Sequence, residues 1–147
     1  MDTSALIALA VPTDKNHRAA SSFLGDAVKH GTRFVLGRPV LIEYVDGVTK
    51  RVGKSQAIRQ LQSIEASGAI RVEPETEEDH RNARELFLRY DDHAIDLTDS
   101  LSFAIMERLG LKEAFTFDRD FVVHGFACQP LSEHDPATTR DAGTRRP

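Results

Sequence analysis

Residues 97–121 read LTDSLSFAIMERLGLKEAFTFDRDF, and this stretch decides the fold. Its first half predicts an apolar helix over residues 97–109 that ends at Gly110, because glycine is favoured just past the end of a helix. Its second half predicts a short buried strand over residues 114–117, followed directly by Asp118. A helix that leads into a short buried strand is typical of α/β proteins.

The same alternation of helices and strands continues on both sides of this stretch. Apolar residues recur at helical spacing over residues 16–30, 39–48, 55–66 and 76–90, and a short helix is expected to end at Val123. Short apolar runs predict strands over residues 33–36, 70–72 and 126–131, and residues 3–10 form one more apolar segment. Strands separated by helices predict an α/β fold in which helices cover both faces of a central, mostly parallel sheet.

The composition suits one globular domain of ordinary size. The chain has 147 residues, of which 40% are hydrophobic and 29% are charged. Its 19 Lys and Arg residues against 23 Asp and Glu residues give a formal net charge of −4, which argues against a generic nucleic-acid binder. The single Cys128 excludes an internal disulfide and a cysteine-based zinc cluster.

We expect residues 1–132 to form this domain. Residues 133–147 contain almost nothing to bury and are expected to form a disordered tail. No apolar run has the length of a membrane span, and the start of the chain lacks the pattern of a signal peptide. The expected location is therefore the cytoplasm.

Five acidic residues lie where predicted helices begin or strands end, or within an apolar helix: Asp2, Glu43, Asp99, Asp118 and Asp120. Each has an ordinary structural interpretation when taken alone. Asp99 could cap its helix, in competition with its neighbours at 96 and 98; Glu43 could lie on a solvated stripe; Asp118 and Asp120 could be turn residues; and Asp2 could simply be exposed. Taken together, carboxylates without ligating His or Cys suit hard divalent cations such as Mg²⁺ or Mn²⁺, which serve phosphoryl transfer above all.

Other common catalytic patterns are missing from the sequence. The six histidines are scattered, and no pair has the i,i+4 spacing of a helical zinc site. The glycines fit no phosphate-binding loop, and no serine stands in a nucleophile-elbow pattern. The pattern therefore favours an acid-only metal centre.

The order of these acids resembles the PIN domain, a small nuclease fold built as a three-layer α/β/α sandwich with a central, mostly parallel sheet. The segments that carry the resemblance are DTSALIAL (2–9), PTDKNHRAA (12–20), LIEYVDGV (41–48), LTDSLSFAIMERLGL (97–111) and AFTFDRDF (114–121). The resemblance extends from residue 1 to about 132 and is strongest to the VapC-type toxins of prokaryotic toxin–antitoxin pairs. Those toxins are Mg²⁺-dependent endoribonucleases, held inactive by a cognate antitoxin and commonly dimeric.

The resemblance implies roles for individual residues. It implies that Asp2, Glu43, Asp99 and Asp118 are the metal-binding catalytic acids, whereas Asp120 matches a position that is acidic in only some members. Thr3, Ser4 and Thr116 match hydroxyl positions beside the site. We also expect a helical or extended antitoxin segment to cover the acidic cleft, in a groove whose wall includes the helix over residues 39–48 and the helix after it. Val45 and Val48 are either contacts in this groove or core residues.

The chain departs from the family at its start. Only Met1 precedes Asp2, where family members have several apolar residues that form the central strand. Either this strand is shortened here or the true start lies upstream. A free amino group one residue from a metal ligand would oppose cation binding.

The implied reaction is hydrolysis of an RNA phosphodiester bond by a positioned water, with one or two ions. The basic residues Lys50, Arg51 and Lys54, together with Arg59, are either solvated helix surface or phosphate contacts beside the site. Two other functions stay open on the sequence alone. The domain could be a catalytically inert PIN-like module that binds a protein, or a DNA structure-specific nuclease, although the latter usually needs a larger chain.

Overall fold

The computed structural model describes residues 1–131, and the tail expected over residues 133–147 lies outside the described residues. Most helices and strands lie within two residues of the predicted bounds, and the apolar segment over residues 3–10 is a helix. The elements in order are α1 (Thr3–Ala10), α2 (His17–Lys29), β1 (Phe34–Gly37), α3 (Arg38–Arg51), α4 (Lys54–Glu65), β2 (Ile70–Glu73), α5 (Glu77–Arg89), α6 (Leu97–Arg108), β3 (Glu113–Phe115), α7 (Asp120–His124) and β4 (Ala127–Gln129).

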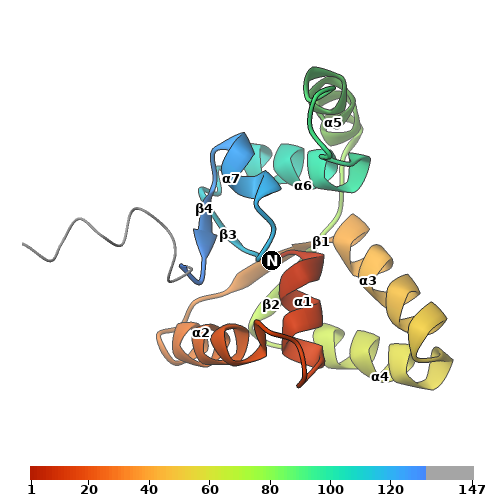
Figure 1. Cartoon of the computed structure of the whole chain (residues 1–147), viewed down its shortest axis with the longest axis vertical. Helices are drawn as coiled ribbons and strands as arrows, with labels where there is room; N and C mark the ends of the chain where they lie inside the picture. Colours follow the sequence, from red (N-terminus) through yellow and green to blue (C-terminus); the bar gives the residue numbers. More distant parts are fainter. Residues whose placement is uncertain (132–147) are drawn as a thin grey trace, which may run out of the picture.

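The strands form two parallel pairs that meet at the N-terminus of the chain. β1 pairs with β2, and β3 pairs with β4, both in parallel. The Met1 amino group donates to the Val35 carbonyl at 2.9 Å, and the Asp2 amide donates to the Phe115 carbonyl at 3.0 Å. Figure 1 accordingly places the N-terminus at the centre of the molecule, beside β1 and β3. Two residues thus connect the two parallel strand pairs, and the parallel pairing agrees with the mostly parallel sheet that the sequence predicted.

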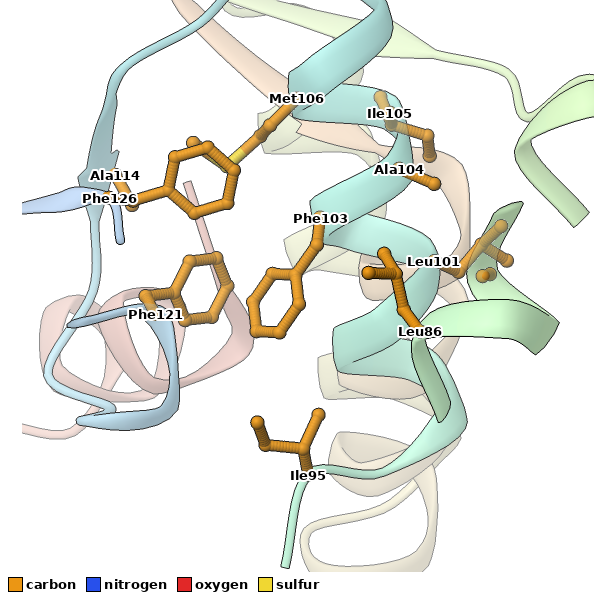
Figure 2. Close-up of a cluster of buried hydrophobic side chains, with 11 residues drawn as sticks. Leu86, Ile95, Leu101, Phe103, Ala104, Ile105, Met106, Ala114, Phe121 and Phe126 are labelled. Carbon is orange, nitrogen blue, oxygen red and sulfur yellow. The ribbon is translucent and has the colours of Figure 1, made fainter. Parts of the chain in front are cut away.

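Helix α6 is the centre of the larger hydrophobic core. Residues 100–106 are all buried, as expected for a helix that is apolar on every side. Its Phe103 ring packs edge-to-face on Phe121 of α7, with ring centroids 5.0 Å apart, and also contacts Phe126 (Figure 2). This packing fixes α7, and with it the loop between β3 and α7, against α6.

An ion-pair network connects β2, α5 and α6. The Arg108 guanidinium donates through Nε to both carboxylate oxygens of Asp79, at 2.9 and 3.0 Å, and through Nη1 to Glu73 at 3.0 Å. Asp79 is fully buried and also closes a capping box with Thr76 at the start of α5. Arg108 therefore neutralises a carboxylate that has no access to water.

No helix among residues 1–131 combines the length and the apolar character needed to cross a membrane.

We predict that Arg108→Ala destabilises the protein by about 3–5 kcal/mol, because it leaves the buried Asp79 charge without its partner. Urea unfolding at neutral pH measures this change. Arg71→Ala is the matched control, since Arg71 also contacts Glu73, at 2.6 Å, but is largely exposed, and its loss should cost about 0–1 kcal/mol. Equal effects of the two substitutions would contradict a special role for the buried pair.

Candidate metal centre

Three aspartates converge at the point where α6 and α7 begin. Asp99, Asp118 and Asp120 each offer one carboxylate oxygen, and these oxygens all lie within 4.8 Å of one another. Asp99 belongs to α6, whereas Asp118 and Asp120 follow β3, so the packing of α7 on α6 brings them together. Each of the three side chains is half-buried.

A capping box holds Asp99 in place. The Asp99 amide donates to Asp96 Oδ1 at 2.9 Å, and the Asp96 amide donates back to Asp99 Oδ2 at 3.2 Å. Such a reciprocal pair satisfies two backbone N–H groups that the first turn of a helix leaves without partners. Asp99 is thus a capping residue and a member of the acidic cluster at once.

Backbone amides likewise fix the two acids that follow β3. The Asp118 amide donates to Thr116 Oγ1 at 2.9 Å, and the Asp120 amide donates to Asp118 Oδ1 at 3.0 Å. Asp120 is the first residue of α7, where the helix dipole favours a negative charge. Asp118 and Asp120 are therefore turn residues and members of the acidic cluster at the same time.

The carboxylate of Asp2 accepts hydrogen bonds from two neighbouring hydroxyl groups. Its Oδ2 accepts hydrogen bonds from Ser4 Oγ at 2.8 Å and from Thr116 Oγ1 at 3.1 Å, and also from the Ser4 amide at 3.1 Å, which caps α1. Ser4 Oγ in turn accepts from the Phe117 amide at 2.9 Å. Asp2 is buried rather than exposed, and the two hydroxyls connect it to the β3–α7 loop.

Glu43 and the basic residues lie along α3. Glu43 is exposed, and its Oε2 accepts a hydrogen bond from Thr3 Oγ1 at 2.7 Å, which links it to the residue next to Asp2. Neither Glu43 nor Asp2 is within the 4.8 Å group of oxygens. Lys50, Arg51 and Lys54 are all exposed at the α3–α4 corner. Arg51 is two turns from Glu43, which is about 12 Å along the helix axis.

The proximity of these carboxylates changes their protonation. Burial, together with the charges of Asp96, Asp2 and Asp118, raises the pKa of Asp99 to about 7, although the hydrogen bond from the Asp96 amide opposes the shift. Burial and the charge of Asp118 also raise the pKa of Asp120, while His93 lowers it. Asp99 therefore carries its proton for about half the time at neutral pH.

The amino group of Met1 is less of an obstacle to a cation than the sequence suggested. Burial lowers the pKa of this amino group to about 6, against the opposing effect of Asp2. It is therefore mostly neutral at pH 7, and it donates to the Val35 carbonyl rather than facing the acids.

The donor set fits a hard divalent cation. In an octahedral Mg²⁺ site, oxygens about 2.1 Å from the ion are separated by at most about 4.2 Å. The oxygens of Asp99, Asp118 and Asp120 lie within 4.8 Å of one another, so a small movement would bring them to that spacing. All three donors are carboxylates, the type that Mg²⁺ and Mn²⁺ prefer.

This chain belongs to the PIN-domain family: the family model described as the PIN domain matches residues 1–127. The 23S rRNA-specific endonuclease VapC20 of Mycobacterium tuberculosis is 32% identical over 123 residues, which cover 77% of this chain and 92% of that protein. The crystal structure of M. tuberculosis VapC20, described as a sarcin–ricin loop cleaving toxin, matches with a TM-score of 0.77 at 28% identity, over 86% of this chain and 94% of that chain. The predicted α/β fold and the predicted family are thus confirmed.

Two charged groups near the cluster were not singled out as site residues from the sequence. Asp96 was considered only as a helix cap, yet its charge raises the pKa values of both Asp99 and Asp120. His93 has the opposite effect on Asp120. Both lie between α5 and α6, just before Asp99, and an acid three residues before another at a helix start is the signal that could have pointed to Asp96.

We predict that Asp99→Asn alters the pH dependence of stability of the metal-free protein. The pKa of Asp99 is about 7 in the folded chain against an ordinary value of 3.8, so the folded state binds more protons between these values. Stability therefore falls as pH rises from about 4 to about 7, and this loss is absent from Asp99→Asn. Melting temperatures in EDTA at pH 5 and pH 7.5 measure the difference between the two proteins.

Asp46→Asn is the matched control, because it removes one carboxylate from the exposed surface of α3. Its difference in melting temperature from the wild type should be smaller and nearly independent of pH. If Asp99→Asn and the wild type lose stability in parallel as pH rises, Asp99 does not share the buried, negatively charged cluster described above.

Proposed function

We propose that this chain acts as a metal-dependent endoribonuclease toxin that hydrolyses a phosphodiester bond in the sarcin–ricin loop of 23S rRNA. The convergence of Asp99, Asp118 and Asp120 at the ends of helices in a PIN fold carries the proposal. The substrate is proposed by similarity to VapC20, whose description names that RNA.

The acidic residues have separate tasks in this proposal. Asp99, Asp118 and Asp120 would hold a Mg²⁺ or Mn²⁺ ion directly, and Asp2 and Glu43 would complete the site from α1 and α3. When bound there, such an ion would supply Lewis-acid activation of the phosphodiester and of a water nucleophile. The protein contributes positioning and a fixed field of carboxylates.

The hydroxyl groups of Ser4 and Thr116 orient Asp2 and the loop that carries Asp118. Ser4 and Thr116 both donate to one oxygen of Asp2, and Thr116 also accepts from the Asp118 amide. Groups that orient a metal ligand in this way contribute to ion affinity without touching the ion. Asp99 must release its proton when an ion binds, so ion affinity should rise with pH through about 7.

RNA would also contact basic residues outside the acidic cluster. Lys50, Arg51 and Lys54 form an exposed basic corner that we propose binds the RNA backbone on the α3 side of the site. This corner reconciles RNA binding with the acidic net charge, since the overall charge says nothing about its local distribution.

We predict that the purified protein cleaves a synthetic RNA hairpin with the sarcin–ricin loop sequence in Mg²⁺ or Mn²⁺, and that EDTA abolishes cleavage. Asp118→Asn should reduce the rate by at least about 100-fold, because a hard cation loses an anionic ligand. Denaturing gel electrophoresis of labelled RNA measures both effects. Asp46→Asn is the control for loss of one surface charge. Cleavage that persists in EDTA would refute the metal mechanism, and no cleavage of any RNA would favour the inert binding module.

The antitoxin would bind a groove that begins at Glu43. This groove, of about 340 Å³, lies between α1, α3 and α4 and is lined by apolar Ile7, Val48 and Val52, with Arg51 at its far end. An apolar groove with a carboxylate at one end suits a helical or extended segment with apolar anchors and an Arg or Lys near the acids. Val45 and Val48 both pack against the core, and of the two only Val48 also lines this groove.

We predict that Gly47→Phe weakens binding of the antitoxin, the product of a neighbouring small gene, by at least about 10-fold, because it places a ring inside the groove. A Cβ atom at Gly47 would meet no heavy atom within 4 Å, so the backbone leaves room for a side chain to start there. Gly25→Phe is the matched control, since Gly25 is also helical, has equally open space and lies on α2 outside the groove. Isothermal titration calorimetry of both variants compares the affinities, and equal affinities would place the antitoxin elsewhere.

We further propose that the protein works in the cytoplasm, where its RNA substrate is found, and that it forms a homodimer as the resemblance implies. Sedimentation equilibrium of the isolated protein measures the second point. A monomer at micromolar concentration would contradict it.

A further inference from the structure

We infer that His124 is a positioning residue for the metal centre, because its imidazole joins the three elements that carry or precede the clustered aspartates. The inference rests on the proposed function in that it assigns His124 a role in ion binding. His124 is the last residue of α7, and Asp120 is the first.

Both ring nitrogens of His124 have partners on other elements. Nδ1 lies 2.9 Å from the hydroxyl of Tyr90, the residue that ends α5, and Nε2 lies 3.0 Å from Oε1 of Glu107 on α6. A neutral imidazole satisfies both contacts, with Nδ1 accepting the Tyr90 proton and Nε2–H donating to Glu107. The His124 side chain is only 7% exposed, whereas that of Glu107 is 52% exposed, so the imidazole itself is largely shielded from water.

Aromatic packing fixes the plane of the same ring. The imidazole stacks on Phe103 with ring centroids 4.4 Å apart and an interplanar angle of 17°, and it also contacts Phe126 at 5.0 Å. The ring is thus held by two polar contacts in its plane and by a stacking contact on its face. Few rotations remain open to a side chain constrained in this way.

The position of Asp120 depends on this arrangement because α7 is very short. It has five residues, and a helix of that length has little stability of its own in water. Its orientation must come from side chains that anchor it, and Phe121 and His124 are the ones that contact α6. Figure 1 shows α7 lying beside α6.

The two hydrogen-bond partners of His124 connect it to the segments that carry Asp99 and Asp96. Glu107 is on α6, which carries Asp99 in its first turn, and lies about 12 Å further along the helix axis. Tyr90 ends α5, and the segment that follows it leads to Asp96, which caps Asp99. A single imidazole therefore ties the end of α7 to the helix that carries Asp99 and to the segment that carries Asp96.

The test separates positioning from a purely structural role. His124→Phe keeps a flat ring that can stack on Phe103 but loses both hydrogen bonds. We expect it to raise the dissociation constant for Mn²⁺, measured by electron paramagnetic resonance without RNA, by about 10-fold. With the sarcin–ricin hairpin at saturating Mn²⁺, kcat should fall while KM for the RNA stays unchanged.

His30→Phe is the matched control. His30 also makes a hydrogen bond through Nδ1, which donates to the Asp26 carbonyl at 2.7 Å, but it lies at the exposed end of α2. Its Mn²⁺ affinity should equal that of the wild type. If His124→Phe does not fold, as judged by near-ultraviolet circular dichroism, Glu107→Ala and Tyr90→Phe remove one partner each from outside the stacked core.

A lower melting temperature of the His124 variant in EDTA together with wild-type Mn²⁺ affinity would overturn the inference, because it shows a structural role only. Wild-type affinity in both Glu107→Ala and Tyr90→Phe would overturn it as well. Failure of the wild type to cleave RNA, with the expected change in Mn²⁺ affinity still present, would refute the proposed function but support the role of His124.

Discussion

Two backbone hydrogen bonds at the start of the chain hold the two strand pairs together. Met1 donates to β1 and Asp2 donates to β3, so the first residues act as the link between otherwise separate parallel pairs. Because the Asp2 amide is bound to the Phe115 carbonyl, the Asp2 side chain is brought within reach of the next residue, Thr116. The arrangement of the acidic site is therefore a consequence of backbone pairing, not of the side chains alone.

Acidic residues are held in two different ways in this molecule, by ion pairs or by hydrogen bonds from uncharged donors. Asp79 is buried, and Arg108 neutralises it within the chain. By contrast, none of the ion pairs found among residues 1–131 involves one of the five candidate acids, and hydroxyl or amide donors instead hold the carboxylates of Asp2, Glu43, Asp99 and Asp118. Such donors orient a carboxylate without cancelling its charge. The first arrangement serves stability, whereas the second leaves negative charge available for a cation from solution.

The sequence predicted the helices and strands well, but it predicted less well how they pack against one another. Helix periodicity and glycine positions gave the bounds of α2 and α6 to within one residue, because these signals are local. Asp99 and Asp118 were predicted as site residues because each lies near the end of an element. The grouping of Asp99 with Asp118 and Asp120 depends on how α7 packs on α6. That packing arises from side chains distant in sequence, so no local pattern could predict it.

The backbone contacts of the acids also bear on how many atoms each can offer. One oxygen of Asp99 accepts the Asp96 amide, and one oxygen of Asp118 accepts the Asp120 amide. Each of these carboxylates therefore keeps one oxygen that takes no part in these turn contacts. The amides that shape the two turns thus fix the orientation of each carboxylate through one oxygen and leave its second oxygen outside the turn.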